Sequence, residues 1–284
     1  MGIGMEADAV RRRLHPEGVV SYVIGCSVDC AAVMADGGYE AIGESVELGG
    51  TGVRLGLGGV DCDAIEAVLR GIRQRFPAVW IEGRSAADLV SIARSGGLGL
   101  RETITRLRDA GLDSFSGEGV DLADGVHAGR CGVQQWIEVH RAAHGLGMRT
   151  TAAMTFGASE TLEQRVDFLE AVRRLQEETG GFAAFVPMAA DAPGGRELDG
   201  VTAVERLKTL AISRMFLDSV ENVQAIGAAQ GIKVLQMALR FGANDAGSVM
   251  KHGDGSEEDL RRIIRDAGFV PVQRDMVYRT MFLN

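Results

Sequence analysis

Two cysteines near the start of the chain have a spacing that suits a pair of metal or cluster ligands. Cys26 and Cys30 are separated by three residues, and Cys62 and Cys131 lie farther along the chain. Thiolates hold iron-sulfur clusters and zinc, whereas four scattered cysteines in a chain of 284 residues do not form a disulfide framework. We therefore expect reduced thiols or ligands.

Carboxylates are the remaining candidates for acid-base chemistry, and we assign candidate catalytic roles to Glu118, Asp121 and Asp245. A dry pocket raises the pKa of such groups toward the range that proton transfer needs. The chain has no Gly-x-Ser-x-Gly elbow and no readable Cys/His nucleophile arrangement. His140 and His144 are one helical turn apart, but no third ligand is near them in sequence, so we do not expect a zinc site.

The elements that must position these residues are short apolar runs, often ending in glycine, that alternate with amphipathic stretches of helical length. Uninterrupted apolar runs are typical of buried parallel strands. The predicted strands are Val19–Gly25, Val53–Gly59, Val79–Gly83, Ser114–Gly119, Thr150–Gly157, Phe182–Ala190, Val223–Gly227 and, more weakly marked, Ala246–Met250. The predicted helices are Tyr39–Leu48, Asp61–Phe76, Ala86–Ser95, Leu100–Ala110, Val133–Gly145, Leu162–Thr179, Ala203–Leu217, Ile232–Phe241 and Glu257–Ala267.

One strand and one helix roughly every 30 residues predicts an α/β protein with a parallel sheet. Seven or eight such units fit a closed (β/α)8 barrel of the TIM type. We expect one barrel domain over residues 1–284, with an N-terminal extension at 1–18 and a C-terminal helix and tail at 257–284. An open, doubly wound sheet is the alternative, because GLGG at 56–59 precedes a helix and a strand that ends near Glu82. The spacing does not match G-x-G-x-x-G, so we interpret these glycines as a tight turn between strand and helix.

Four stretches spread along the chain resemble a known family: VELGGTGVRLGLGG (46–59), RTTAAMTFGASETLEQRVDFL (149–169), LQEETGGFAAFVPM (175–188), and LRFGANDAGSVM with AGFVPVQRDMVYR (239–250 and 267–279). They are similar to the radical S-adenosylmethionine (SAM) enzymes of the futalosine route to menaquinone, above all the cyclic dehypoxanthine futalosine synthases, ahead of the aminofutalosine and deazaflavin-cofactor synthases. The resemblance covers nearly the whole chain from about Ser21. It implies a radical SAM-type barrel with its site at the C-terminal ends of the strands.

The resemblance also implies a cluster loop, and this chain departs from it. The family carries C-x3-C-x2-C after the first strand, where three thiolates hold a [4Fe-4S] cluster whose fourth iron chelates SAM. Here the matching residues are Cys26, Cys30 and Val33. Cys62, after the second strand, is the only substitute ligand that we consider, although a small apolar residue at a helix start is the simpler interpretation. Cys131 is expected to be incidental. We therefore expect no intact cluster.

Residues that match the family's SAM-binding positions follow the second, fourth and fifth strands. The family's Gln-Gly-Gly becomes Leu-Gly-Gly here, so Gly58 and Gly59 keep a close backbone approach and lose the amide. The turn from Glu118 to Asp121 matches a glycine-rich turn with an acid that could hold ribose hydroxyls; a solvated turn is the alternative for Glu118. Thr155 ends the fifth strand. We expect Gly58, Gly59, Glu118 and Thr155 to bind SAM or a related nucleoside.

Other candidates come from the last third of the chain. Gln224, Asn244 and Asp245 match pocket-lining positions of the family, and Arg274 matches its tail; we assign substrate binding to Gln224, Asn244 and Arg274. For Arg274 a latch that closes the barrel is an equal alternative. Ser159 is interpreted as a helix N-cap. Two further stretches are altered, the polar one after the sixth strand to PMAAD (187–191) and the basic one after the fourth to HAGR (127–130). Changes gathered at one end of a retained scaffold suggest that the family's chemistry was lost without loss of the fold.

Composition narrows the partners. The formal net charge is −9 and no Lys/Arg run occurs, which argues against nucleic acid and anionic membranes as partners. No apolar signal core and no stretch of about 20 apolar residues is present. We expect a cytoplasmic protein with a small-molecule substrate.

Three functional hypotheses remain. The first is an enzyme that kept a SAM-type pocket and performs polar chemistry such as methyl transfer, cyclisation or elimination on a small metabolite. The second is a radical synthase of the futalosine type with an unconventional cluster ligand. The third is a non-catalytic protein that binds a metabolite or a partner. The substitutions at the expected site favour the first hypothesis over the second, and the retained acids favour it over the third.

Overall fold

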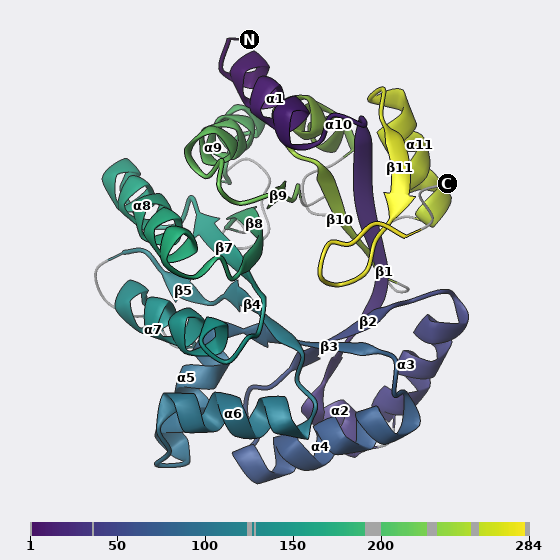
Figure 1. Cartoon of the computed structure of the whole chain (residues 1–284), viewed down its shortest axis with the longest axis vertical. Helices are drawn as coiled ribbons and strands as arrows, with labels where there is room; N and C mark the ends of the chain where they lie inside the picture. Colours follow the sequence, from purple (N-terminus) through teal and green to yellow (C-terminus); the bar gives the residue numbers. More distant parts are fainter. Residues whose placement is uncertain are drawn as a thin grey trace.

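In the computed structural model, the chain folds into a ring of parallel strands surrounded by helices (Figure 1). The structure describes residues 2–35, 37–123, 127, 129–190, 200–225, 232–250 and 256–281. The predicted strand end at Gly227, together with Ala128 and Asp191 of the two altered stretches, lies outside these ranges. Within the described part, no helix has the length and apolar character needed to cross a membrane.

The strands of the ring follow one another in chain order. They are β1 (Val19–Asp29), β2 (Gly52–Gly56), β3 (Trp80–Ser85), β4 (Ser114–Glu118), β7 (Thr150–Phe156), β8 (Phe182–Ala189), β9 (Asn222–Val223) and β10 (Asp245–Met250). β10 pairs with β1, and a parallel bridge between Gln224 and Asp245 joins the β9 side to β10. The ring is therefore closed, and the predicted eight-stranded barrel is confirmed.

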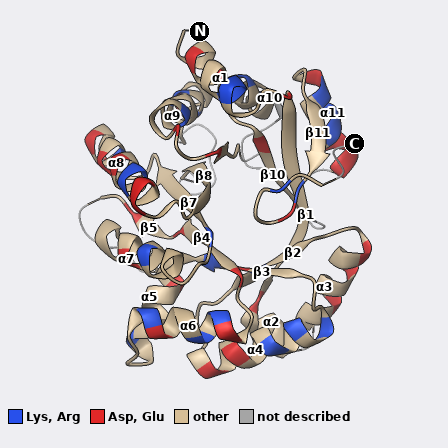
Figure 2. Ribbon diagram, viewed as in Figure 1, with Lys and Arg blue, Asp and Glu red and all other residues tan. Residues whose placement is uncertain are grey.

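Helices cover the outside of the ring (Figure 1). They are α1 (Gly2–Leu14), α2 (Cys30–Met34), α3 (Gly37–Glu47), α4 (Cys62–Arg75), α5 (Ala86–Ser95), α6 (Leu100–Ala110), α7 (Val133–His144), α8 (Leu162–Thr179), α9 (Ala203–Phe216), α10 (Ile232–Arg240) and α11 (Glu257–Asp266). Residues of both charge signs are mixed along these helices (Figure 2). The main core lies between helices and strands, where apolar side chains such as Leu55, Ile81, Trp136 and Phe185 are fully buried.

Three features add to the predicted elements. The N-terminal extension predicted at 1–18 contains the helix α1, which packs on α9. A small pair of strands, β5 (Val120–Asp121) and β6 (Cys131–Gly132), follows β4. The strand β11 (Val270–Gln273) pairs with β1 from Val19 to Tyr22, and the segment after it crosses the ring at the N-terminal ends of the strands (Figure 1).

Candidate functional site

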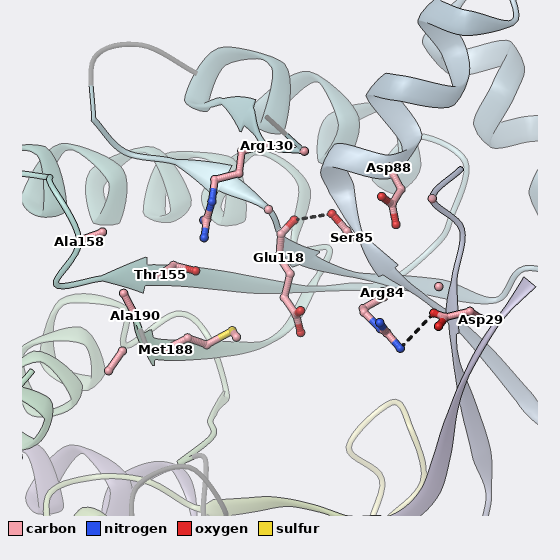
Figure 3. Close-up of a pocket in the computed structure, with 15 residues that line it drawn as sticks. Asp29, Arg84, Ser85, Asp88, Glu118, Arg130, Thr155, Ala158, Met188 and Ala190 are labelled. Atoms are coloured by element: carbon pink, nitrogen blue, oxygen red, sulfur yellow. Dashed lines mark hydrogen bonds and ion pairs between the residues drawn. The ribbon is translucent and has the colours of Figure 1, made fainter. Parts of the chain in front are cut away.

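A cavity of about 890 Å³ lies at the C-terminal ends of the barrel strands (Figure 3). In parallel α/β barrels this end carries the active site, because the loops that follow the strands converge there. Strands β1, β2, β3, β4, β7 and β8 all reach the cavity. Its lining residues are Asp29, Gly56, Gly58, Arg84, Ser85, Asp88, Glu118, Gly119, Gly129, Arg130, Thr155, Ala158, Met188, Ala189 and Ala190.

Glu118 is the acid that the end of β4 places at the cavity. Its carboxylate accepts a hydrogen bond from Ser116 Oγ (3.4 Å) and lies 3.9 Å from a guanidinium nitrogen of Arg54. Its backbone oxygen accepts a bond from Ser85 Oγ (3.1 Å), which ties β4 to the end of β3 (Figure 3). Burial raises the pKa of Glu118, while the positive charge of Arg54 acts in the opposite direction. A half-buried carboxyl with a raised pKa can exchange a proton with a ligand in the cavity.

A second group of charges surrounds the end of β1. Arg84 donates a hydrogen bond to Ser27 Oγ (2.6 Å). It also lies 3.4 Å from a carboxylate oxygen of Asp29 (Figure 3). Burial raises the pKa of Asp88, although a hydrogen bond from the backbone of Leu57 opposes this effect. These charges can orient polar groups of a ligand at this side of the cavity.

Two glycines line the cavity at the end of β2. A Cβ atom at Gly56 would collide with a carboxylate oxygen of Asp29, and one at Gly58 would lie 3.3 Å from Asp88 Oδ1. Gly56 is buried against Asp29, whereas Gly58 is exposed, so the backbone at Gly58 can approach a bound molecule. Gly59 has φ +77°, which favours glycine, but it does not line the cavity.

Only some of the residues predicted to form the site lie together at the C-terminal end of the barrel. Glu118, Gly58 and Thr155 line the cavity. Asp121 does not, because β5 directs it to His127, whose backbone N–H and ring Nδ1 bond to its carboxylate. Burial alone would raise the pKa of Asp121, but these bonds outweigh that effect and hold the pKa below its ordinary value. We therefore regard Asp121 as a loop-fixing residue.

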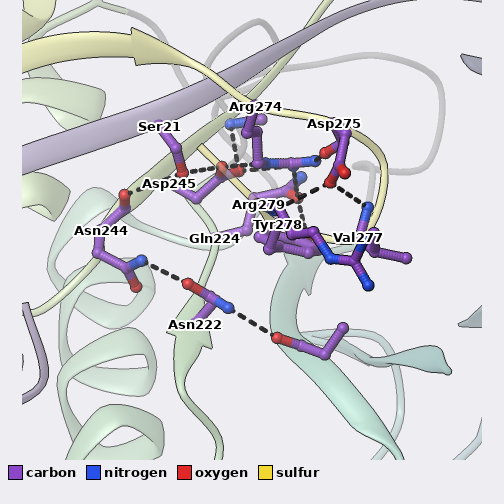
Figure 4. Close-up of polar contacts among 12 residues, drawn as sticks. Ser21, Asn222, Gln224, Asn244, Asp245, Arg274, Asp275, Val277, Tyr278 and Arg279 are labelled. Carbon is purple, nitrogen blue, oxygen red and sulfur yellow. Dashed lines mark hydrogen bonds and ion pairs between the residues drawn. The ribbon is translucent and has the colours of Figure 1, made fainter. Parts of the chain in front are cut away.

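The residues predicted at the cavity from the last third of the chain do not line it and lie toward the N-terminal ends of β1 and β10. Figure 4 shows the polar contacts that join them. Asp245 is the first residue of β10, and it pairs in register with Ser21 near the start of β1. Its carboxylate accepts two hydrogen bonds from Arg274, at 2.5 and 3.0 Å. Gln224 accepts a bond from Tyr278 (2.7 Å) and bridges to Asp245. The placement predicted for these residues was therefore wrong.

Asn244 is also a structural residue in this arrangement. Its side-chain oxygen accepts bonds from Arg214 and from the backbone of Val223, and its amide donates to Asn222. A residue that precedes a strand lies at the N-terminal end of that strand, and this explains the misplacement of Asn244 and Asp245. For Arg274, the latch interpretation describes the observed contacts, although the ion pair is buried and not at the surface.

The cysteines do not fit the three-thiolate set that the resemblance implies. Cys26 lies within β1, where its thiol hydrogen-bonds with Ser45 of α3. Cys30 is fully buried at the start of α2, and burial together with two nearby carboxylates raises its pKa to about 12. Val33 is buried, and its backbone and side chain are so close to Gly38 that a Cβ there would collide with them. None of these side chains lines the cavity.

The remaining cysteines are farther removed from such a role. Cys62 begins α4 and lies near Arg106 of α6, and burial raises its pKa. Burial also raises the pKa of Cys131 to about 11. Within the described ranges, no three His, Cys, Asp or Glu side chains are grouped so that they could hold one metal ion. The thiols present, each of which must lose a proton before binding iron, therefore do not match a complete cluster site.

The two histidines on α7 are packed inside the protein. His140 and His144 both bond to Thr150 Oγ1 (2.8 Å each), and His144 also bonds to Thr179 Oγ1 (2.7 Å). Burial lowers the pKa of His140 well below its usual value and that of His144 to about 4. They contribute polar contacts beneath α7 and do not reach the cavity.

Four charged residues of the cavity were missed by the sequence analysis. They are Asp29, Arg84, Asp88 and Arg130. Arg84 directly follows the strand predicted to end at Gly83, so the rule that strand ends carry the site could have found it. Arg130 was noted only as part of the altered HAGR stretch; its guanidinium donates to Val120 O (3.1 Å).

The predicted cap of α8 was wrong. Ser159 does not cap this helix, because Thr161 is the N-cap residue and its hydroxyl accepts a bond from Gln164 N (3.1 Å).

Comparisons with known proteins give a consistent result. Residues 179–283 match the model of the CofH/MqnC C-terminal region. The chain is 31% identical to the cyclic dehypoxanthine futalosine synthase of Streptomyces coelicolor, over 99% of this chain and 82% of that protein. It is 35% identical to the 5-amino-6-(D-ribitylamino)uracil–L-tyrosine 4-hydroxyphenyl transferase of Methanothermobacter thermautotrophicus, over 84% of this chain and 73% of that protein. The crystal structure of methylornithine synthase has the same fold, with a TM-score of 0.68 at 12% identity over 95% of this chain and 88% of that one.

Proposed function

Because the chain belongs to the CofH/MqnC family of radical SAM proteins, we propose that its cavity binds SAM or a related nucleoside beside a small metabolite. The observation that carries this proposal is the position of Glu118 at the wall of a cavity of about 890 Å³. Ligand pockets are commonly about 300–1,000 Å³. A cavity near the upper end of that range has room for a nucleoside and a second small molecule.

The nucleoside would use the groups at the ends of β2 and β4. Gly58 is exposed and lines the cavity, so its backbone can approach the nucleoside. The Glu118 carboxylate, when ionised, can accept hydrogen bonds from two ribose hydroxyls, and bonds to a charged acceptor are stronger than neutral ones. Thr155 supplies a hydroxyl from β7 on the same wall.

We propose polar chemistry for the metabolite, such as methyl transfer, cyclisation or elimination. The thiols at Cys26 and Cys30 and the apolar Val33 do not fit a complete cluster site, so no step is assigned to a cluster. Glu118, like Asp88, is a half-buried acid of the cavity with a raised pKa, which suits a group that accepts a proton from the metabolite and returns it later.

A radical synthase of the futalosine type is the second candidate, and the comparisons favour it. The aligned relatives are named as synthases and transferases of this family and match over most of their lengths. This candidate needs a substitute third ligand, and Cys62 would have to leave its buried position near Arg106 on the outer helices. A non-catalytic protein that binds a metabolite would retain the cavity without turnover.

Calorimetry with SAM and S-adenosylhomocysteine tests the proposal. Glu118→Gln is expected to weaken binding about tenfold or more, which corresponds to about 1.4 kcal/mol per decade. Glu163→Gln, an exposed acid on α8, is the matched control and should bind as the original chain does. If Glu118→Gln binds the nucleosides as tightly as Glu163→Gln does, or if the original chain gives no heat with either nucleoside, the proposed site is contradicted.

Iron and sulfide analysis after anaerobic reconstitution separates the two candidates. Stoichiometric iron and sulfide with absorption that dithionite bleaches would support the radical candidate, and Cys62→Ala would then test the substitute ligand. Nucleoside binding without a cluster would support polar chemistry. Binding without turnover of any tested metabolite would support the non-catalytic alternative.

A further inference from the structure

Three charged side chains meet inside the barrel next to the cavity. Arg54 is on β2, Glu82 on β3 and Glu118 at the end of β4, and Arg54 pairs in register with Glu82. Val53 and Leu55 on either side of Arg54 are fully buried in the apolar core, so the alternation of the strand places Arg54 on the opposite face. Neither Arg54 nor Glu82 lines the cavity.

The guanidinium of Arg54 is shared unequally between the two acids. Its Nε donates to Glu82 Oε2 at 2.9 Å, whereas its Nη1 is 3.9 Å from Glu118 Oε1. Glu82 is only 4% exposed, and among the described residues Arg54 is its only ion-pair partner. Burying a carboxylate is unfavourable unless a positive charge compensates it. Arg54 therefore neutralises Glu82 first, and Glu118 receives only the remaining attraction.

Other groups around Glu118 do not replace this cation. Ser116 offers a hydroxyl at 3.4 Å from the same strand. Arg84 on β3 acts on Glu118 more weakly than Arg54 and is engaged by Asp29 and Ser27. Arg130 lines the cavity and donates to a backbone oxygen. On the other side of the cluster, Tyr278 from the C-terminal segment is in electrostatic range of Arg54 and Glu82.

We propose that Arg54, anchored on Glu82, is a positioning residue that holds the Glu118 carboxyl at the cavity and balances its protonated and ionised forms. The importance of Glu118 for a ligand rests on the proposed function. The relation among the three side chains does not, because it concerns the protein without ligand. The two neighbours act with opposite sign: Arg54 favours the ionised form of Glu118, and Glu82 disfavours it.

Carbon-13 NMR of protein labelled at the glutamate carboxyl carbon tests this directly. The Glu118 signal is the one that is missing in Glu118→Gln. In Arg54→Met we expect its titration midpoint to rise by about one to three pH units, since an attractive charge is removed. In Glu82→Gln we expect the midpoint to fall, because a repelling charge is removed and Arg54 is released toward Glu118. Arg70→Met, which removes an exposed arginine on α4 that pairs with Glu66, should leave the midpoint unchanged.

Opposite shifts in the two variants would support the proposal, since a purely structural role would not reverse its sign. Shifts in the same direction, or a midpoint unchanged within about 0.3 pH units, would overturn it. If Arg54→Met does not fold, Arg54→Lys and Glu82→Gln carry the test: the lysine variant keeps the charge and should stay within about one pH unit of the original midpoint. If these shifts occur but calorimetry shows no nucleoside binding, the proposed function fails while the positioning role stands.

Discussion

Replacing Arg274 by methionine should strongly destabilise the protein, because this residue neutralises a carboxylate that has no access to water. Asp245 is 0% exposed and the Arg274 side chain only 3% exposed. Two hydrogen bonds join them, and the ring of Tyr278 lies 3.7 Å from the guanidinium. After the substitution, the hydrogen bonds left to the Asp245 carboxylate among the described residues would be those from Ser21 Oγ and from the backbone of Gly247.

The expected loss follows from burial. Removing one partner of a buried ion pair typically costs about 3–5 kcal/mol, since the other charge is left uncompensated. The control is Arg141→Met on α7, whose guanidinium also makes two bonds to a carboxylate, that of Glu178. Both of those side chains are nearly half exposed, and such a surface pair contributes about 0–1 kcal/mol. The two variants should therefore differ by about 2–5 kcal/mol in the free energy of unfolding.

Urea unfolding followed by circular dichroism measures this difference as a change in midpoint at constant slope. The double variant Asp245→Asn/Arg274→Met should lose less than the sum of the two single changes, because no charge is then left buried. If Arg274→Met loses no more than Arg141→Met, or if the single losses simply add, the ion pair does not stabilise the base of the barrel as argued.

Two further predictions concern the wall beneath α7. Gly117→Ala should lower the free energy of unfolding by about 1–3 kcal/mol, because the new Cβ would lie 2.6 Å from Thr151 O on the adjacent strand. The control is Gly37→Ala, since a Cβ at Gly37 would meet open space. If the two variants are equally stable, the packing argument is contradicted. His144 is neutral in the folded protein with a pKa of about 4, so its contribution to stability is complete above its unfolded pKa of about 6.5 and is lost as the pH falls toward 4. Unfolding titrations at about pH 7.5 and about pH 5 should show a loss about 2 kcal/mol smaller in His144→Gln than in the original chain, and an equal loss would contradict this assignment.

The barrel could be predicted from the sequence because its strands carry strong local signals. Runs such as Thr150–Phe156 and Phe182–Ala189 are buried on both faces and therefore read as continuous apolar segments. β11 could not be predicted in this way, since it is short and its first residue, Val270, is exposed. Its position depends on pairing with β1, more than 240 residues earlier in the chain.

Site residues at the C-terminal ends of strands could be predicted from the sequence. Residues were misplaced or missed where their position depends on which end of a strand they occupy or on partners distant in the sequence. Glu118 and Thr155 were placed correctly because they end strands at the cavity. Asn244 precedes β10 and Asp245 begins it, so both lie at the N-terminal end of that strand. Arg54 and Glu82 lie inside predicted strands, and the register between β2 and β3, which the sequence does not show, brings their charges into contact.

The pairing of β1 with strands near the other end of the barrel sequence has a consequence for folding during synthesis. β1 leaves the ribosome well before β10 and β11, yet it pairs with both of them. The charge of Asp245 can likewise be compensated only after Arg274 has been synthesised. Contacts between such distant parts of a chain slow folding, because a large loop must close before they are formed. β2 can pair with the C-terminal half of β1 early. We expect the parts of β1 that pair with β10 and β11 to stay open until those strands are synthesised, and the nascent chain to depend on chaperones during that interval.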